Sequence, residues 1–375
     1  MTTDVRSLRR PRVKPEHRPY RTVDGHVRIG SVVHGIGAEI ADPKGWVWLL
    51  VEALDGSRAP SAVVARVLAG HGDVTGEDVW QAMADLLAAG FLEDAAAPVP
   101  VSGRGRERYS RGVPLLRWMD RGPRTSPWEA QLLLRRARVL VLGVGGTGGH
   151  AAQSLVASGV GQVHCVDPDV VELSNLNRQP LFREDDIGRP KTEAAVATLR
   201  ALNSDVTVTG ERLEVRGPAD LTALLAGGDP DLLVLAADRP DDLRRWVNRA
   251  CIAAGLPWVD AGYRGPLVTA GVYVPGRGAC WECLRVGEAA RRELRLAPGQ
   301  DERVASPRMP WNPASAVTAG LSGALLAHAA LALLTGIPDL EPGFRFGVNL
   351  MLPGEPHLQR FPRQADCAAC GGVRT

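Results

Sequence analysis

A change of pattern near residue 138 constrains the fold of this chain most strongly. Four short apolar runs, at residues 138–143, 162–167, 206–210 and 231–238, alternate from there with helix-like segments at 148–159, 190–203 and 240–255. Parallel strands need long crossover connections, which are usually helices. The alternation therefore predicts an α/β fold with a doubly wound, mostly parallel sheet. Ligands of such sheets bind beyond the carboxyl ends of the strands, so functional residues are expected there.

A glycine-rich turn directly follows the first apolar run. Residues 143–153 read GVGGTGGHAAQ, in which Gly143, Gly145 and Gly148 fit the pattern G-x-G-x-x-G. In a Rossmann-like sheet these glycines give a tight turn, a close backbone approach to phosphate, and close packing of the next helix. The pattern predicts a phosphate-binding turn. It does not identify the nucleotide, because hydride-transfer enzymes, nucleotidyl-transfer enzymes and some proteins that bind nothing share it.

Polar and charged residues after two of the strands favour a triphosphate over a dinucleotide. Asp167 ends the second strand, at a spacing suited to the ribose of either NAD or ATP. The next stretch contains Asn175, Arg178, Gln179 and Lys191. One such cation alone is usually a solvated surface group, but a cluster after a nucleotide turn suits a triphosphate under attack. Asp238 ends the fourth strand, where a magnesium ligand would be needed; the alternative is a helix N-cap.

Four of the six cysteines form two C-x-x-C pairs, which are Cys280 with Cys283 and Cys367 with Cys370. Two thiolate pairs at this spacing suit a structural zinc ion, and a redox pair or buried free thiols are the alternatives. Four thiolates leave no open coordination position, so this zinc should not be catalytic. Cys165 falls in a predicted strand and Cys251 in a predicted helix, and both are expected to be core residues.

As a set, these motifs resemble the ThiF/MoeB superfamily, the bacterial relatives of ubiquitin-activating enzymes. The resemblance rests on ERYSR at 107–111, GVGGTGG, VDPDVVELSNLNRQ at 166–179, GRPK at 188–191 and the two cysteine pairs, in family order. It implies an adenylyltransferase that activates a carboxylate with Mg-ATP and releases pyrophosphate. It also implies roles for individual residues: nucleotide binding by Gly143, Gly145 and Gly148, ribose binding by Asp167, phosphate binding by Asn175, Arg178 and Lys191, Mg²⁺ binding by Asp238, and Zn²⁺ binding by Cys280, Cys283, Cys367 and Cys370.

The same resemblance implies a homodimer, because Arg111 matches an arginine that family members lend to the partner's active site. Two positions depart from the family and leave substrate positioning open: Arg239 stands where Asn is common, and RYSRG replaces RYxRQ. Many relatives also carry a cysteine that takes the activated carboxyl as a thioester. Residues 284–314 contain no cysteine, so direct attack by a bound nucleophile is expected instead.

A separate N-terminal domain is predicted at residues 1–95, followed by a linker at 96–107 and the adenylation domain at 108–375. Residues 1–20 are basic, contain three prolines and are expected to form a loose tail. A hairpin at Asp24-Gly25 and three helices, at 42–54, 59–70 and 75–90, predict a small winged-helix-like α+β unit. Thr75 is a plausible N-cap of the third helix, with Val79, Met83, Leu86 and Leu87 on its apolar face.

The unit contains KPEHRPYRTVDGHVRIG at 14–30, WVWLLVEALDG at 46–56 and LLAAGFLED at 86–94. With these segments it resembles the PqqD-like leader-peptide-recognition elements of MccB-type peptide-modifying enzymes, which implies capture of a ribosomal precursor peptide. DNA binding and a structural or dimerisation role are the alternatives. The third helix carries Glu77, Asp78 and Asp85 and no Lys or Arg, which argues against DNA because recognition helices are basic.

Composition excludes other classes of function. The formal net charge is +2 over 375 residues, with no long single-sign block, so nucleic acid is not expected as the main partner. No signal-peptide core or uninterrupted apolar stretch of about 18 residues is present, so a cytoplasmic protein without a membrane partner is expected. The leading interpretation is adenylation of a carboxylate, or carboxamide, on a ribosomal peptide. The alternatives are activation of a small sulfur-carrier protein, a non-catalytic leader-binding partner of a cyclodehydratase and, least favoured, an NAD-linked oxidoreductase.

Overall fold

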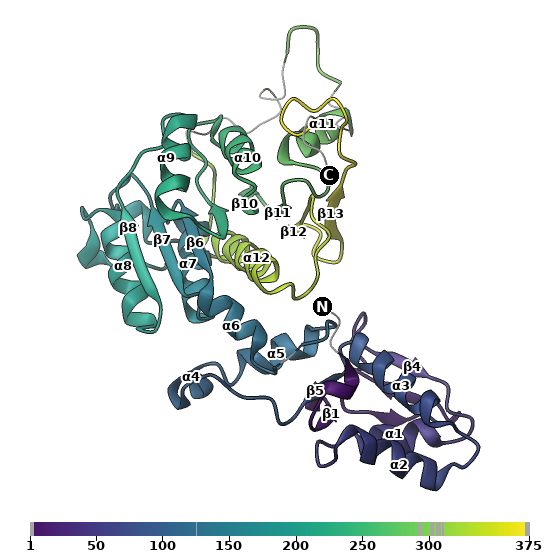
Figure 1. The fold of residues 1–375 in the computed structure, drawn as a ribbon. Coiled ribbons are helices and arrows are strands. Elements are labelled where there is room, and N and C mark those ends of the chain that lie inside the picture. The colour runs from purple at the N-terminus through teal and green to yellow at the C-terminus, as the bar shows by residue number, and fades with distance from the viewer. Residues whose placement is uncertain are drawn as a thin grey trace. The chain divides into compact units, whose positions relative to one another are not determined.

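A computed structural model of the protein describes residues 4–124, 126–291, 295–300, 304, 309 and 311–371. Contacts between residues divide the chain into two compact units, Met1–Leu133 and Leu134–Thr375. Figure 1 labels the helices and strands of both units.

The N-terminal part of the first unit includes three consecutive helices and a three-stranded antiparallel sheet. The helices are α1 (Trp46–Ala53), α2 (Pro60–Gly70) and α3 (Gly76–Ala88). The strands are β2 (Tyr20–Arg21), β3 (Val27–Ile29) and β4 (Ala38–Ile40), in the order β2-β3-β4. Gly25 lies in the turn between β2 and β3 with φ +84°, a conformation that glycine adopts without strain. The hairpin and the three helices that the sequence predicts are therefore present, and the winged-helix-like arrangement stays a prediction.

Helix α3 follows its sequence signals closely. The Thr75 side chain accepts a hydrogen bond from the Asp78 backbone N–H, and the Asp78 carboxylate accepts one from the Thr75 backbone N–H. This capping box satisfies donors that the helix start leaves open. The predicted apolar face is buried in the core of the unit: Val79, Met83, Leu86 and Leu87.

The expectation of a loose N-terminal tail is wrong. β1 (Pro11–Val13) pairs antiparallel with β5 (Leu92–Asp94), and two short 3₁₀ helices flank it, η1 (Val5–Ser7) and η2 (Pro15–His17). The side chains of Val5, Leu8 and Val13 are buried in the same core as the helices. This apolar burial and the strand pairing fix a segment whose prolines and arginines suggested disorder.

Residues beyond the predicted domain boundary also pack on the first unit. The chain continues with α4 (Gly103–Arg108), α5 (Gly112–Met119) and α6 (Glu129–Arg136), so part of the expected linker is helical. Arg117 of α5 pairs with Glu16 at 3.0 Å and with Glu93 at 2.9 Å. Because the Glu93 side chain is only 3% exposed, this pair holds α5 against the N-terminal strands. The boundaries at residues 95 and 108 remain a prediction.

The second unit is built on an eight-stranded sheet in the order β13-β12-β11-β10-β9-β6-β7-β8. Its strands are β6 (Arg138–Leu142), β7 (Gln162–Val166), β8 (Thr207–Glu211), β9 (Leu232–Leu235), β10 (Trp258–Arg264), β11 (Leu267–Tyr273), β12 (Phe344–Asn349) and β13 (Pro356–Arg360). Five neighbouring strands of this sheet, β10, β9, β6, β7 and β8, are parallel. The pairings β10–β11, β11–β12 and β12–β13 are antiparallel. Leu142 pairs in register with Val166 and Leu235, so the carboxyl ends of β6, β7 and β9 meet at one edge.

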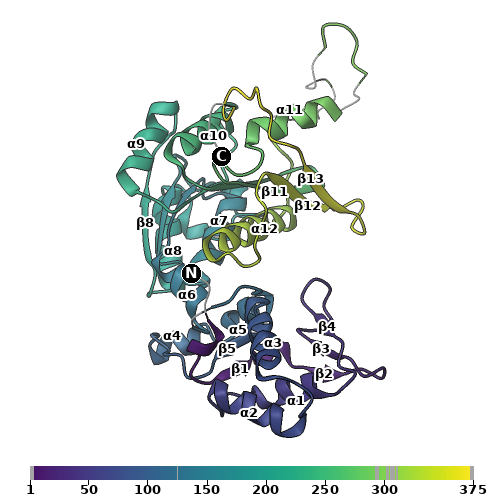
Figure 2. The same cartoon turned by 45° about the vertical axis from the view of Figure 1, so that its right-hand side comes forward.

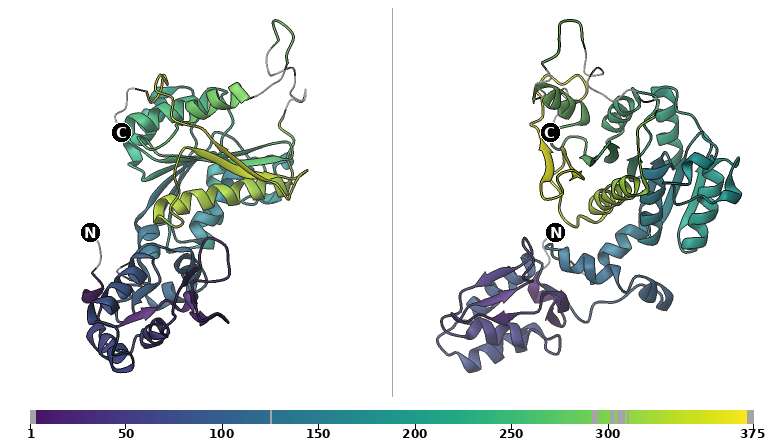
Figure 3. Two further views of the ribbon diagram at one scale, coloured as in Figure 1. Left: turned by 90° about the vertical axis from the view of Figure 1, so that its right-hand side faces the viewer. Right: turned by 180° about the vertical axis from the view of Figure 1, so that it is seen from behind.

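Helices cover both faces of this sheet, as Figures 2 and 3 show. One face carries α7 (Gly146–Ala157), α8 (Lys191–Leu202) and α12 (Ala316–Thr335); the other carries α9 (Pro218–Gly228), α10 (Leu243–Ala254) and α11 (Trp281–Arg291). The doubly wound, mostly parallel α/β fold is therefore confirmed. Two short 3₁₀ helices, η3 (Leu173–Asn175) and η4 (Glu184–Asp186), lie in the connection from β7 to α8.

Helix α12 is long and apolar enough, by length and composition alone, to cross a membrane. In this fold it packs against α7 and against β10 and β11. A Cβ at Gly323 of α12 would lie 2.6 Å from the Thr147 carbonyl oxygen of α7, so the two helices approach closely. Packing inside the unit thus accounts for the apolar composition of α12.

Candidate nucleotide site and cysteine cluster

The glycine turn joins β6 to α7, and each of its three glycines has a distinct geometry. Gly143 has φ +92°, and a Cβ at Gly148 would collide with the Gly143 carbonyl oxygen. At Gly145, by contrast, the nearest atoms to an added Cβ belong to Gln179 and lie 3.6 Å away or more. The backbone is therefore sharply turned at Gly143, tightly packed at Gly148 and open at Gly145. A phosphate-binding turn needs these features, and the open N-terminus of α7 favours an anion there.

Asp167 lies at the carboxyl end of β7 and braces this turn. Its Oδ2 accepts a hydrogen bond from the Val144 N–H at 2.8 Å, and its Oδ1 accepts one from the Asp169 N–H at 3.0 Å. The side chain is buried, and burial raises the pKa of the Asp167 carboxyl, while the Lys191 ammonium opposes that rise. The predicted ribose contact would use the same carboxylate that orients the turn.

Lys191 is the first residue of α8, and its side chain is only 8% exposed. A cation in the first turn of a helix opposes the helix dipole, so it needs a partner. Its Nζ donates to Asp169 Oδ2 at 2.8 Å, and the Asp169 side chain is 62% exposed. Lys191 is thus a nearly buried cation paired with an exposed carboxylate.

The loop around η3 carries the other predicted phosphate-binding residues. Asn175 is buried and its Oδ1 accepts the Glu172 N–H, so its amide braces the loop. Arg178 donates to the Ser174 carbonyl oxygen at 2.8 Å, and its backbone oxygen lies beside Gly146 at the start of α7. Gln179 is buried next to Gly145, and its Oε1 accepts no hydrogen bond from the described residues. A buried acceptor without a donor is costly, so this position suits a bound group that can donate.

Asp238 follows β9, and its side chain is 65% exposed. Its carboxylate pairs with Arg244 Nη2 at 3.0 Å. Tyr263 of β10 lies close to both Asp238 and Arg178. Burial raises the pKa of the Tyr263 hydroxyl, and the charge of Asp238 adds to this rise. Arg178 opposes the rise through its charge and a hydrogen bond. The structure therefore brings Arg178 and Asp238 to one side chain. Sequence reasoning missed Tyr263 and Arg244, because no local motif marks either residue.

Arg111 belongs to the first unit, where it is the exposed N-cap residue of α5. All the other candidate residues named above belong to the second unit. A role for Arg111 in catalysis remains a prediction.

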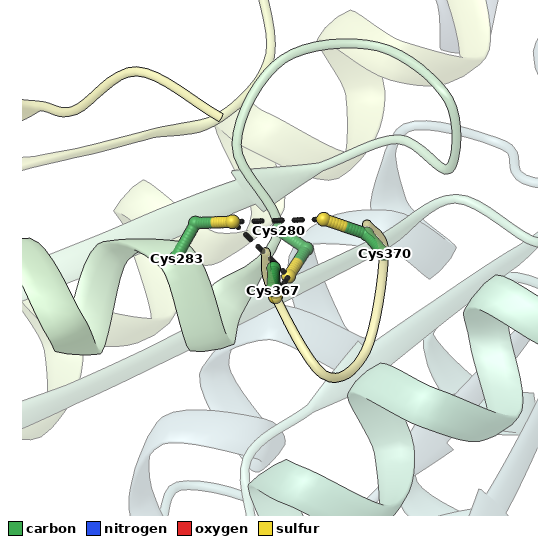
Figure 4. Close-up of side chains that lie close together, drawn as sticks. All are labelled: Cys280, Cys283, Cys367 and Cys370. Carbon is green, nitrogen blue, oxygen red and sulfur yellow. Dashed lines mark hydrogen bonds between the residues drawn. The ribbon is translucent and has the colours of Figure 1, made fainter. Parts of the chain in front are cut away.

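The four paired cysteines form a single cluster, shown in Figure 4. Their Sγ atoms all lie within 4.8 Å of one another. Three Sγ–Sγ distances are 3.8 Å for Cys280–Cys283, 3.7 Å for Cys280–Cys367 and 3.5 Å for Cys283–Cys370. A tetrahedral zinc site with Zn–S bonds of about 2.3 Å places its sulfurs about 3.8 Å apart. The cluster fits zinc, which would join residues 367–370 to the start of α11.

Two further contacts suit thiolate ligands in this cluster. The Asn248 side-chain amide of α10 donates to Cys280 Sγ at 3.6 Å, and the Gln364 N–H donates to Cys283 Sγ at 3.4 Å. Donors of this kind orient metal-bound thiolates and stabilise their charge.

The two remaining cysteines are core residues, as predicted. Cys165 in β7 and Cys251 in α10 are both fully buried. Burial raises the pKa of Cys165 to about 12, with the Asp167 charge adding to the effect, and burial also raises the pKa of Cys251. Since a thiolate is the reactive form, neither side chain is prepared to form a thioester.

Comparison with known proteins assigns this fold and site to a family. The chain matches the ThiF family over residues 113–369, which is more than half of its length, and it belongs to that family. The predicted resemblance to the ThiF/MoeB superfamily is thereby confirmed.

Two curated relatives illustrate the class. The SAMP-activating enzyme E1 of Haloferax volcanii is 39% identical over 183 residues, covering 48% of this chain and 61% of that protein. The sulfur carrier protein ThiS adenylyltransferase of Bacillus subtilis is 38% identical over 158 residues, covering 42% and 46%. The chain thus spans about half to three fifths of the length of these relatives.

A solved structure matches almost the whole chain. E. coli MccB superposes with a TM-score of 0.78 and 24% identity, covering 98% of both chains. The match extends through both compact units, and it establishes a shared fold.

Proposed function

We propose that the protein uses Mg-ATP to adenylate a carboxylate, or a carboxamide, of a ribosomally made peptide during natural-product biosynthesis. The observation that supports this most is the open start of α7 beside Arg178, together with the nearly buried Lys191 ammonium, which lies close enough to the turn-bracing Asp167 to affect the pKa of that carboxyl. The relatives named as adenylyltransferases support the reaction class. Solved structures of E. coli MccB with ATP and with N-formylated MccA, which share this fold, support a peptide substrate.

In this proposal ATP is a substrate that supplies an electrophilic α-phosphate. A substrate carboxylate oxygen bonds to that phosphorus, the bond to the β-phosphate oxygen breaks, and pyrophosphate leaves. Lys191 would exchange Asp169 for a phosphate oxygen, and Arg178 would neutralise further charge. Asp238, an exposed carboxylate at a strand end, suits Mg²⁺, which prefers oxygen ligands. The acyl-adenylate would then meet a bound nucleophile directly, since no thioester cysteine is evident.

Calorimetry and pyrophosphate exchange test this proposal together. We expect binding of Mg-ATP and not of NAD, and peptide-dependent exchange of labelled pyrophosphate into ATP. Tight NAD binding without ATP binding would overturn the proposal, and ATP binding without any exchange would favour the non-catalytic alternative.

The first unit offers a groove for the precursor peptide. It has a volume of about 710 Å3 and runs between β4 and α3, with Ala38 and Ile40 on one side and Ala82 and Asp85 on the other. β4 is the last strand of its sheet, so a captured segment could add a strand there, a common mode of peptide binding. The lining combines apolar side chains with three aspartates and one lysine, which favours a leader with apolar and basic residues.

A larger side chain in this groove should impair binding of the precursor peptide without impairing the adenylation step. We expect Ala82→Arg to lower kcat/KM for a full-length precursor about tenfold or more, because capture raises the local substrate concentration towards millimolar. Pyrophosphate exchange driven by a short core peptide at high concentration should remain. Glu77→Arg is the matched control, since Glu77 lies on the same helix, is 79% exposed and does not line the groove. Equal loss with both substrates, or with neither, would remove the capture hypothesis.

A small carrier protein is the alternative substrate, supported by the relative that acts on ThiS. A purified carrier that drives exchange in the Ala82→Arg variant as well as in the wild type would favour it. Cysteines that form no disulfide suit a reducing compartment, so we propose a cytoplasmic location for the protein with either substrate.

We also propose that the active form is a homodimer in which Arg111 serves the partner's site. Mixed Arg111→Ala and Asp238→Ala subunits should then regain part of the wild-type activity, because one site per dimer would contain both intact groups. Activity of the mixture, after subunit exchange has been confirmed by mass spectrometry, is the measurement. If the mixture is no more active than the separate variants, Arg111 acts within its own chain or not at all.

A further inference from the structure

Arg244 connects the exposed Asp238 to a buried carboxylate. Its Nη2 lies 3.0 Å from Asp238 Oδ1, and its Nε lies 3.1 Å from Asp260 Oδ2. The Asp238 side chain is 65% exposed and the Asp260 side chain 3%. One end of this bridge is therefore open to ligands, while the other is part of the protein interior.

The buried end of the bridge is rigidly held. Asp260 Oδ1 accepts the Tyr273 hydroxyl at 3.2 Å, and Asp260 Oδ2 accepts Arg345 Nη2 at 3.2 Å. The neighbouring Gly271 leaves room for this arrangement, because a Cβ there would lie 2.5 Å from Asp260 Oδ1. Arg244 is thus anchored to a fixed point on β10.

Helix stability does not account for an arginine at this position. Arg244 is the second residue of α10, where a cation opposes the helix dipole. The next residue, Arg245, is 51% exposed and pairs with Asp242 at 2.8 Å, whereas only 24% of the Arg244 side chain is exposed. The two carboxylates around Arg244 offset its unfavourable location, so its position is set by Asp238 and Asp260.

The surroundings leave Asp238 free to change partner. Asp238, Arg244 and Asp260 line a cavity of about 430 Å3, so the Asp238 carboxylate has space to move while Arg244 remains anchored. A divalent cation at Asp238 must overcome the charge of Arg244, which lowers the affinity of that carboxylate for free cations.

We propose that Arg244 is a positioning residue for adenylation. It holds Asp238 in place before the nucleotide arrives, keeps that carboxylate from binding stray cations, and retains its contact with Asp260 when Asp238 turns to the nucleotide-bound cation. The inference rests on the proposed function, because that function identifies the ligand as Mg-ATP. The contacts of Arg244 with Asp238 and Asp260 are independent of it.

Binding of Mn²⁺ to the nucleotide-free, full-length protein, followed by electron paramagnetic resonance, gives a test separate from activity. We expect Arg244→Gln to bind Mn²⁺ about fivefold more tightly, since a unit charge at this distance in water has an effect of that order. Adding Asp238→Asn to Arg244→Gln should abolish the gain. Arg244→Lys retains the positive charge but cannot pair with Asp238 and Asp260 at once. Its Mn²⁺ affinity should therefore equal that of the wild type. Arg245→Gln, on the adjacent residue, should change nothing.

Pyrophosphate exchange supplies the second readout. Arg244→Lys should lower kcat at saturating Mg-ATP about tenfold, because orientation of Asp238 is lost while charge is kept. Unchanged or weaker Mn²⁺ binding in Arg244→Gln, or a wild-type kcat in Arg244→Lys, would overturn the proposal. If Arg244→Gln fails to fold, the kcat of Arg244→Lys still decides. Lack of exchange in the wild type would instead defeat the proposed function, and the Mn²⁺ comparison would still test the Arg244 contact.

Discussion

Lys191→Ala is expected to reduce pyrophosphate exchange about 10²–10³-fold while the protein remains folded. The Lys191 ammonium is nearly buried at the carboxyl end of the sheet, close enough to Asp167 to affect its pKa. A preorganised charge in such a site stabilises the negative charge that develops on the attacked phosphate. The fold should survive, because the partner Asp169 is 62% exposed and can be solvated when the lysine is removed.

The measurement is the exchange rate at saturating ATP, together with thermal unfolding of each variant. Arg189→Ala is the matched control, since Arg189 lies two residues away, is 46% exposed and pairs with Asp186 outside the glycine turn. An exchange rate within a few-fold of the wild type in Lys191→Ala would show that Lys191 only stabilises the loop through Asp169.

Cys367→Ser is expected to lose the metal and much of the thermal stability of the second unit. The purified wild type should contain close to one zinc ion per chain, because the four Sγ atoms form one closed cluster. Structural zinc in small domains binds with an apparent free energy of about 10–16 kcal/mol, part of which stabilises the fold. Three thiolates without the fourth should hold zinc far less firmly.

Elemental analysis by mass spectrometry and thermal unfolding with and without a chelator measure both effects. Cys251→Ala is the control: Cys251 is a buried core thiol of α10, outside the cluster, so that variant should keep its zinc at a modest cost in stability. A wild type that is well folded and free of metal would contradict the assignment.

Local patterns predicted the strands from β6 to β9 and the helices α7, α8 and α10, because each of these elements carries its own signal; the strands from β10 to β13 and the helices α9 and α11 were not predicted. The glycine turn, the apolar run of β6 and the start of α7 are contiguous, and the C-x-x-C spacing directly places two ligands at a time. The same logic holds for α3, whose cap and apolar face lie within one short segment.

Interactions between distant segments could not be anticipated in this way. β1 pairs with β5 about eighty residues later, so the first twenty residues appeared unstructured when their local composition was considered alone. Tyr263 and Arg244 lie beside the candidate residues Arg178 and Asp238 only because β10 and α10 bring them there. Their chemistry is visible in the sequence, but their location depends on tertiary packing.

The cysteine cluster also changes the connectivity of the chain. With zinc bound, Cys283 and Cys367 are two ends of a closed ring that includes α12 and the strands β12 and β13. A single backbone cut between those two cysteines would leave both fragments tethered through the metal. The ring could therefore accept a nick, or a longer insertion in its exposed stretches, without releasing the end of the chain.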